Sequence, residues 1–335
     1  MRKMIPLGLV LVIATALAGC GGTSGSGAAS SAGSGQNVTI KLADDFPASD
    51  PFNQFLQTFA SDVHQNSKGS VTIKLFTGNQ LGGESDIVRG IANGTIEMGL
   101  TGVTGYAPLD AFFTPYAVAS EKQLSLVLQN NILKQYFDTF EQQQKAHLVG
   151  SLYVSPREVT SGKPISTVSD IGGVKLRVPQ IKSEVEVFKA LGADPAVLAF
   201  PEVYTALQSG TVQAQENPVS TILSAKFYEV QKYLDMTNHG IQPEYVFVNT
   251  KTWAALSPEQ QSAITSAFTK MQTQQQTEGA AAFDKDVAQL QQNGMTVVHP
   301  DNAAFRAKVY DSTVKPILTQ LWGANIVSQV NGLPS

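Results

Sequence analysis

Arg177 is the residue of this 335-residue chain with the clearest chemical potential, and it lies in a short apolar run, VKLRVP at residues 174–179. Side chains alternate between the two faces of a strand, so Lys175 and Arg177 point the same way. A guanidinium offers two parallel N–H donors that match the oxygens of a carboxylate, and it stays protonated. Because a lone strand cation usually lies on a solvated face, the run alone leaves both roles open.

Two further polar residues follow strand-like segments. Arg157 comes directly after a strand expected at residues 145–154, where loops often present binding groups. Asn217 precedes Pro218, which suits the first position of a helix, so the Asn217 amide is expected near the positive end of that helix. This amide can donate to a carboxylate oxygen, but the position is equally typical of simple helix capping.

The sequence shows no pattern of catalytic or metal-ligating residues. The four histidines, His64, His147, His239 and His299, are scattered, and the only cysteine is Cys20. There is no Gly-x-Ser-x-Gly elbow and no Gly-rich phosphate loop. We therefore expect no metal and no cofactor. An enzyme acting on an organic acid remains an alternative, because a cleft can host chemistry without a known motif.

The elements that must position these residues alternate between strands and helices. Strand-like alternation is present at residues 38–43, 70–76 and 96–100, and helical spacing of apolar residues at 53–63 and 87–92. Asn93-Gly94 is a typical helix end. A second block repeats the rhythm at 145–154, 174–178, 184–191 and 244–250. This order predicts an α/β fold with mostly parallel sheets.

A long helix is expected to begin at Ser257. Ser257 is suited to the N-cap and Pro258 to the first turn. Ile264, Phe268 and Met271 mark a buried face, and the helical pattern continues towards Gly294. Such a helix is longer than an ordinary domain helix and would reach along more than one domain.

The N-terminus predicts export. Arg2 and Lys3 precede an apolar stretch that is too short to span a membrane, so residues 1–19 are expected to be a signal peptide. The stretch ends in Leu-Ala-Gly-Cys, which resembles the lipobox of bacterial lipoproteins, with lipidation at Cys20. A plain signal peptide with an incidental cysteine is the alternative. Residues 20–37, rich in Gly and Ser, are expected to form a flexible tether.

Composition excludes several classes of function. The formal net charge is −4, whereas a nucleic-acid-binding protein usually has a basic surplus. The roughly 300 residues after the tether suit two domains. No second long apolar segment follows the first, so the mature chain is not expected to span the membrane. We expect a monomer outside the cytoplasm, periplasmic or at the cell surface and anchored by lipid at Cys20.

Several longer stretches carry a resemblance to a known family. They are GNQLGGESDIVRGIANGTIEMG, REVTSGKPI, DIGGVKLRVP, ALGADPAVLAFPEVYTALQSGTVQAQENP and KFYEVQKYLDMTNH. In order and spacing, residues 38 to about 300 resemble the substrate-binding proteins of TRAP transporters, the DctP-type family. The chain departs from the family pattern at Gln213-Ala214, where Asp-Gly is usual; this loosens a local turn and leaves residues 216–218 intact.

The resemblance implies a two-lobed α/β fold like that of periplasmic binding proteins, with hinge strands and a long helix that spans both lobes. Lobe I would comprise residues 38–154 and 243–282, and lobe II residues 155–242 and 283–335. The ligand would bind in the cleft between the lobes.

The resemblance also implies a set of ligand-binding residues. Arg177 would grip a substrate carboxylate, with Arg157 and Asn217 completing the clamp, and Phe200 would pack against the ligand body. Other positions that can face the cleft in relatives are Asp45, Glu84, Thr101 and His239, of which the two acids could accept hydrogen bonds from hydroxyls or an amine. Gly102 stands where sialic-acid binders of the family carry a glutamate, which disfavours sialic acid.

The function implied is a receptor that captures a small organic acid anion and delivers it to a permease of one small and one large membrane subunit, driven by an ion gradient. The acid itself stays open: C4-dicarboxylates, 2-oxo acids, sugar acids and aromatic acids all carry the carboxylate. A binding lipoprotein of an ATP-driven (ABC) importer or of a sensor system is the alternative.

Overall fold

The first sheet of the computed structural model, which describes residues 36–335, has five strands. β1 pairs in parallel with β2 and β3, whereas β10 runs antiparallel to β3 and β4. The strand order is β2 (Val71–Phe76), β1 (Val38–Ala43), β3 (Met98–Thr101), β10 (Pro243–Asn249) and β4 (Ala146–Tyr153). Alternation along β1 buries Ile40 and Leu42, which is the pattern that the sequence predicts.

Two helices pack near this sheet as their apolar spacing predicts. α1 (Phe52–Asn66) buries a stripe that includes Leu56, Phe59 and Val63. α2 (Glu84–Asn93) buries Ile87 and ends at Gly94, whose φ of 82° is left-handed. Because a residue without a Cβ adopts this conformation at little cost, the glycine explains where the helix stops.

The second sheet has six strands and is also mixed. β6 pairs in parallel with β7 and β8, and β11 with β9, but β5 runs antiparallel to β8 and β9. The order is β11 (Thr296–Val298), β9 (Tyr233–Gly240), β5 (Arg157–Ser161), β8 (Ala214–Pro218), β6 (Lys175–Val178) and β7 (Asp194–Val197). The expectation of mostly parallel sheets is therefore wrong in part, because strands that enter one sheet from the other run against their neighbours.

Short helices accompany the second sheet and position its loops. α6 (Lys182–Leu191) follows β6 and buries Val187 and Phe188. The others are η2 (Phe200–Glu202), α7 (Val203–Gln208), α8 (Val219–Ser224) and η3 (Phe227–Glu229). A separate apolar cluster joins α7, α8 and η3 to the end of a long helix.

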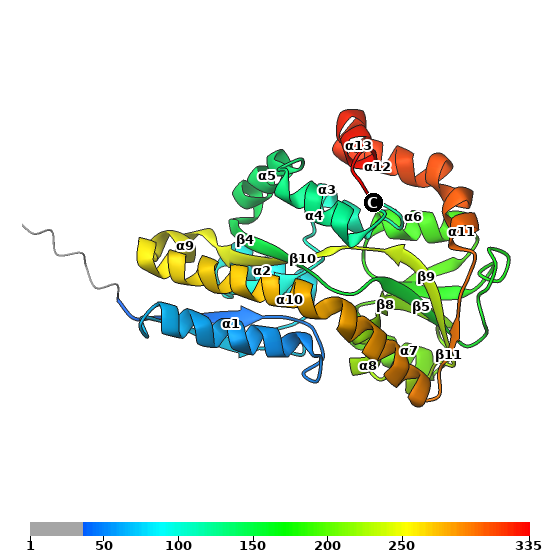
Figure 1. The fold of residues 1–335 in the computed structure, drawn as a ribbon, viewed down its shortest axis with the longest axis horizontal. Coiled ribbons are helices and arrows are strands. Elements are labelled where there is room, and N and C mark those ends of the chain that lie inside the picture. The colour runs from blue at the N-terminus through cyan, green and yellow to red at the C-terminus, as the bar shows by residue number, and fades with distance from the viewer. Residues whose placement is uncertain (1–35) are drawn as a thin grey trace, which may run out of the picture. The chain divides into compact units, whose positions relative to one another are not determined.

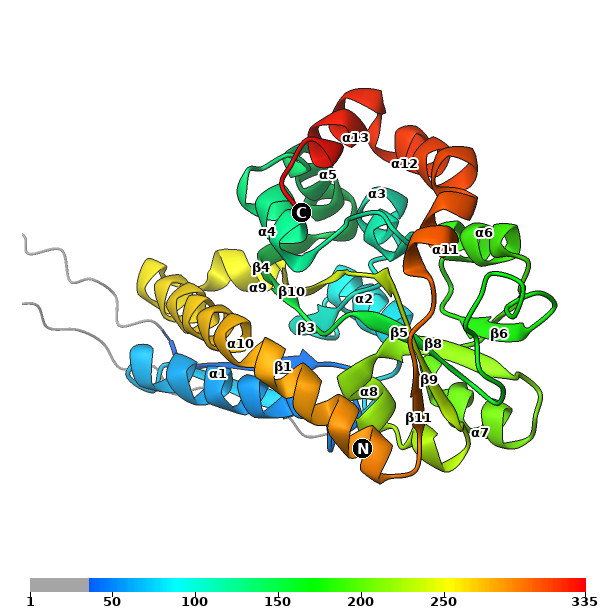
Figure 2. The ribbon, with the colours of Figure 1, turned by 45° about the vertical axis from the view of Figure 1, so that its right-hand side comes forward.

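We call the part of the chain built on the five-stranded sheet lobe I, and the part built on the six-stranded sheet lobe II. Three connections link the two lobes. β4 leads into β5 through residues 154–156, and β9 leads into β10 through residues 241–242. The third is α10 (Pro258–Gln292), a helix of 35 residues that runs past both sheets in Figures 1 and 2. Phe268 packs in the apolar cluster of lobe I, and Leu290 in a cluster of lobe II. A long lobe-spanning helix is thus confirmed.

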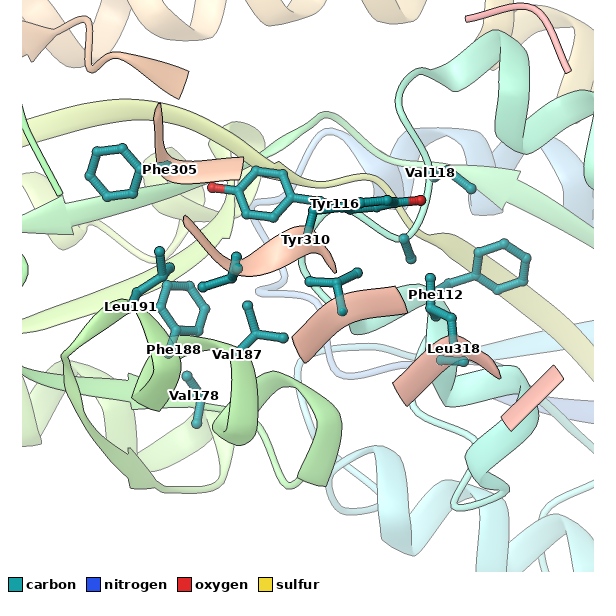
Figure 3. Close-up of a cluster of buried hydrophobic side chains, with 14 of the residues drawn as sticks. Phe112, Tyr116, Val118, Val178, Val187, Phe188, Leu191, Phe305, Tyr310 and Leu318 are labelled. Atoms are coloured by element: carbon teal, nitrogen blue, oxygen red, sulfur yellow. The ribbon is translucent and has the colours of Figure 1, made fainter. Parts of the chain in front are cut away.

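The C-terminal helices join lobe II to a segment that precedes β4. Figure 3 shows Phe112 and Tyr116 of this segment in one buried cluster with Phe188, Tyr310 and Leu318. The helices concerned are α3 (Ala107–Asp110), η1 (Ala111–Phe113), α4 (Glu121–Gln129), α11 (Asn302–Val309), η4 (Tyr310–Val314), α12 (Lys315–Trp322) and α13 (Ala324–Asn331). The part of lobe I around residues 111–133 therefore shares its core with lobe II.

Two helices remain, α5 (Lys134–Gln144) and α9 (Thr250–Ala255), which both pack against β4. Within residues 36–335, no helix is long and apolar enough to cross a membrane. The expected signal peptide, the lipidation site at Cys20 and nearly all of the Gly/Ser tether lie outside the described residues.

Candidate ligand-binding site

A small cavity lies between the two lobes and is lined by charged residues from both. Its volume is about 50 Å³, which is room for a few water molecules. Lobe I and the adjoining connection contribute Asp45, Phe46, Pro47, Glu84, Phe113, Gln242 and Glu244; lobe II contributes Arg157, Arg177, Pro179, Phe200, Asn217, Pro218 and Thr221. Six of the eight residues that the sequence predicts for the site line this cavity.

Arg177 lies on β6 with a side chain that is only 3% exposed. Its Nε and Nη2 atoms donate to the carbonyl oxygen of Leu198, at 3.0 and 2.8 Å, which fixes the plane of the guanidinium. Among the described residues it forms no ion pair with a carboxylate. Burial lowers the pKa of Arg177, although Glu216 opposes the shift. The cavity wall therefore carries a buried cation that is in direct contact with no carboxylate of the described residues.

Lys175 has a different environment although it shares the face of Arg177 along the strand. Lys175 begins β6 and is exposed. Gln213 holds the backbone of Lys175 through two hydrogen bonds. The side-chain oxygen of Gln213 accepts from the Lys175 backbone N–H at 3.1 Å, and the backbone N–H of Gln213 donates to the Lys175 carbonyl at 2.8 Å. Gln213, where the chain departs from the family pattern, thus helps to set the register of β6.

Arg157 is the first residue of β5, so the expectation that it follows the strand in a loop is wrong. Its guanidinium is 6% exposed and forms a two-pronged ion pair with Glu216, with Nη2 at 2.7 Å from Oε1 and Nε bonded to Oε2. Burial disfavours the cation, but Glu216 outweighs this and raises the pKa of Arg157. Arg157 also faces Phe113 of lobe I, 5.5 Å from the ring centre.

Asn217 and Phe200 complete the wall of lobe II. Asn217 is buried on β8 beside Pro218, which caps α8 and is not its first residue as the sequence predicts. Its Oδ1 accepts from Arg157 Nη2 at 3.3 Å, and its amide donates to Gln215. Phe200 is half-buried and packs edge-on against Phe227, at 6.2 Å between ring centres.

The wall of lobe I is acidic. Asp45 follows β1, Glu84 opens α2, and Glu244 lies on β10. Glu84 is fixed by the backbone amides of Gly102 and Val103, which donate to its Oε1 at 3.0 and 2.9 Å. Burial and the neighbouring carboxyls raise the pKa of Asp45 and of Glu244 well above their usual range.

Thr101 and His239, expected to face the ligand, do not line the cavity. Thr101 lies behind Glu84 and donates to its Oε1 at 3.2 Å. His239 is buried behind Glu216, with Nε2 3.2 Å from Glu216 Oε2 and Nδ1 2.8 Å from Thr237. Each supports a charged residue near the cavity from behind.

Glu244, Gln242 and Thr221 line the cavity but are absent from the sequence-based set. Gln242 Oε1 and Thr221 Oγ1 are buried without a hydrogen-bond partner among the described residues, and they are available to a ligand. A polar residue in the short connection between β9 and β10 was the available signal for Gln242. Nothing local distinguishes Glu244 from other residues that open a strand.

Gly102 packs closely against the side chains of Glu244 and Phe113. A Cβ at this position would lie 2.6 Å from Glu244 Oε1 and 2.9 Å from the ring of Phe113. A larger residue here would therefore shift both side chains, and the sequence-based argument against sialic acid stays a prediction.

The fold and the cavity define a class of protein. Two α/β lobes are joined by two strand connections and one long helix, and a buried charged cavity lies between them. This is the architecture of a two-lobed ligand-binding protein that encloses a small molecule.

Comparison with known proteins gives the family. Residues 42–317 match the model of the bacterial extracellular solute-binding protein family 7, DctP, and the chain belongs to this family. A curated relative, a solute-binding protein of Roseobacter denitrificans, is 32% identical over 86% of this chain and 91% of its own length.

Solved structures of relatives share the fold. A TRAP periplasmic solute-binding protein from Roseobacter denitrificans with bound L-galactonate has a TM-score of 0.80 and 31% identity, covering 89% of this chain and 98% of that chain. A sugar-acid-binding protein from Advenella mimigardefordensis in complex with galactonate has a TM-score of 0.83 and 26% identity, covering 89% and 99%. A TRAP periplasmic solute-binding protein from Polaromonas bound to D-erythronate has a TM-score of 0.83 and 25% identity, covering 89% of this chain and 99% of that chain.

Proposed function

We propose that this chain is the receptor of a TRAP transporter for a hydroxylated organic acid, and that it binds the acid without transforming it. The observation that carries the proposal is the state of Arg177, a buried cation at the cavity with no carboxylate partner among the described residues. A buried charge is costly unless it is paired, so the lobe II wall is prepared for an anion.

The acidic wall opposite Arg177 indicates the rest of the ligand. Asp45, Glu84 and Glu244 face the cavity, and carboxyl oxygens accept hydrogen bonds from hydroxyl groups. A second carboxylate on the ligand would meet no cation at this wall, because the lobe I residues that line the cavity include no lysine, arginine or histidine. A polyhydroxylated monocarboxylate, such as the galactonate and erythronate bound by the solved relatives, satisfies both walls.

Entry of such a ligand requires the lobes to part. The cavity of about 50 Å³ is too small for a six-carbon sugar acid. The two strand connections at residues 154–156 and 241–242 and the helix α10 are the places where hinge bending can occur. Closure would bring Asp45 and Glu84 of lobe I back towards Arg177 of lobe II and remove the ligand from water.

The cellular setting is part of the proposal. A lipid at Cys20 would keep a monomeric receptor at the outer face of the membrane, close to the small and large permease subunits. Deletion of Cys20 would then release soluble receptor. Service to an ABC importer, to a sensor or to an enzymatic reaction are the competing outcomes.

Calorimetric titration tests the proposal with L-galactonate, D-erythronate, succinate and an amino acid as ligands. We expect sugar acids to bind and to be recovered unchanged by NMR after long incubation. Arg177→Lys should bind at least about tenfold more weakly, because a point charge replaces a planar two-pronged donor. Lys175→Arg is the matched control on the same strand and should bind as wild type. Turnover of the acid, or equal affinity of Arg177→Lys, would overturn the proposal.

A further inference from the structure

Glu184 is a buried carboxyl group with no assigned role. It lies in the first turn of α6 and is 1% exposed. Neither of its carboxyl oxygens has a hydrogen-bond partner among the described residues. An unpartnered buried carboxylate would cost several kcal/mol, so its state requires an explanation.

The groups around Glu184 come from four strands of the second sheet. Its carboxyl oxygen, a Glu216 oxygen on β8 and a His239 nitrogen on β9 all lie within 4.8 Å of one another. The charges of Arg157 on β5 and Arg177 on β6 also act on it. The charged side chains of the other elements packed against α6 are exposed: Asp194 of β7, Arg306 and Lys308 of α11, and Asp311 of η4.

Glu216 and Glu184 cannot both be ionised at low cost. Glu216 is fully buried and accepts the two-pronged bond from Arg157, while His239 contacts its Oε2 atom. Burial opposes ionisation of Glu216, but Arg157 and His239 outweigh it and lower the pKa to about 2. Burial and the Glu216 carboxylate raise the pKa of Glu184 well above its usual range. Two carboxyl groups at this distance repel each other when both are ionised, and a proton on one of them removes the repulsion.

We propose that Glu184 holds a proton directed at the Glu216 carboxylate, and that this proton leaves the lobe II wall with the single positive charge that the carboxylate of the ligand neutralises. On the lobe II side, Arg157 and Arg177 carry two positive charges and Glu216 one negative charge, while burial lowers the pKa of His239 and favours its neutral form. A neutral Glu184 then leaves one net positive charge on this wall, opposite the acidic wall of lobe I. Loss of the proton would cancel it. Glu184 is thus a positioning residue for charge, which rests on the proposed capture of an acid at Arg177.

A metal ion bound by Glu184, Glu216 and His239 is the competing explanation for their proximity. Both oxygens of Glu216 are already engaged by Arg157, and the guanidinium would repel a cation at this distance. A metal would also require both carboxyls to be ionised. The proton satisfies the same geometry without displacing Arg157.

The inference predicts that acid binding weakens as the pH rises. A bound anion favours the protonated form of Glu184, and ionised Glu184 removes the net charge that attracts the anion. Because the pKa of Glu184 is raised well above its usual range, affinity should fall by about tenfold or more as the pH is raised into the alkaline range where Glu184 ionises.

Infrared difference spectroscopy tests the proton without any ligand. The spectrum of wild type minus Glu184→Gln at neutral pH should show the carbonyl band of a protonated carboxyl. If only carboxylate bands are lost, the inference is overturned even if acids bind. Glu184→Met, an apolar replacement of similar length, gives a second difference spectrum if the glutamine variant folds poorly. Zinc or calcium that raises the melting temperature of wild type but not of Glu184→Gln would favour the metal.

Titration with L-galactonate or, if it does not bind, with whichever acid the calorimetric screen identifies, tests the consequence. Glu184→Gln should lose the alkaline weakening, whereas Glu158→Gln should keep it. Glu158 is the matched control because it is a buried glutamate of β5 whose pKa burial raises to about 8, but it bonds to Asn238 and does not line the cavity. A uniform gain in affinity at every pH would show that Glu184 is ionised, and an unchanged slope would show that it has no role. Absence of binding at any pH instead contradicts the proposed function.

Discussion

Strands β5 and β6 of the second sheet each present a buried guanidinium to the same cavity, but the two cations differ in the groups that pair with them. Arg157 on β5 is paired by Glu216, a residue of the neighbouring strand. Among residues 36–335, Arg177 on β6 bonds only to the carbonyl of Leu198, a neutral acceptor. The first cation is paired within the folded protein, whereas under the proposed function the second is paired by the anion of the ligand.

The comparison teaches that burial and residue type alone do not identify a binding residue. Both arginines are more than nine-tenths buried and both line the cavity. What separates them is the charge balance of the surrounding side chains. It follows that substitution of Arg157 should mainly lower stability, whereas substitution of Arg177 should mainly lower affinity.

Arg157→Met should have the largest effect. The variant leaves Glu216 buried without its cation, and breaking a buried ion pair typically costs about 3–5 kcal/mol of unfolding free energy. Chemical denaturation of the ligand-free protein measures this. The double variant Arg157→Met/Glu216→Leu should recover part of the loss, and a single variant as stable as wild type would remove the distinction.

Arg177→Met should leave the ligand-free protein at least as stable as wild type, because it removes a buried cation that no side chain pairs. Binding of a sugar acid should weaken by about 100-fold or more, since the ligand carboxylate would lose its charged donor. Calorimetry and denaturation on the same sample measure both quantities. Lys175→Met, exposed on the same strand, serves as control and should change neither.

Acid should separate the two arginines further. Burial opposes ionisation of Glu216, but Arg157 and His239 lower its pKa to about 2, below the usual 4.5. This carboxylate therefore contributes stability that is fully present above about pH 4.5 and is lost as the pH falls towards 2. We expect Glu216 to contribute about 3 kcal/mol to the acid destabilisation of wild type, since each pKa unit corresponds to about 1.4 kcal/mol. In Glu216→Gln that part of the pH slope should be missing, and an identical slope would contradict the assignment.

Asp45→Asn should have the smallest effect. Its carboxyl has a raised pKa and faces the hydroxyl end of the proposed ligand, so the amide retains one acceptor oxygen. Affinity for a sugar acid should change by less than about tenfold, corresponding to one hydrogen bond of about 1 kcal/mol. Titration calorimetry measures it, and a loss as large as that of Arg177→Met would show that the acidic wall matters equally.

Much of the fold follows from local patterns in the sequence. Alternation gives β1, apolar spacing gives α1 and α2, and Ser257 with Pro258 gives the start of α10, where the Ser257 hydroxyl accepts from the Gln260 amide at 3.3 Å. These features depend on near neighbours in the chain. The antiparallel course of β10 and β5 does not, because it depends on how the chain crosses between sheets.

The site was harder to predict for the same reason. Arg157 and Glu216 are 59 residues apart, and only the β5–β8 register, with Val159 opposite Glu216, brings them together. Glu184 is unremarkable in the sequence as an early acidic residue of a helix. Its significance comes from the buried charges of the strands beneath α6, which no local pattern reveals.

The helix α10 constrains how far the receptor can open. Side-chain amides of Gln272 and Gln275 donate to the carbonyls of Ser151 and Tyr153, the former at 2.7 Å, and so fasten the helix to β4 beside a hinge. Sliding of the helix along that strand would break both bonds. We therefore expect the helix to bend beyond Gln275 when the lobes part. Gly279 lies on this stretch, where a glycine weakens the preference of the backbone for the helical conformation. We expect Gly279→Ala to resist this bend and so to limit how far the lobes part, because alanine favours the helical backbone more than glycine does.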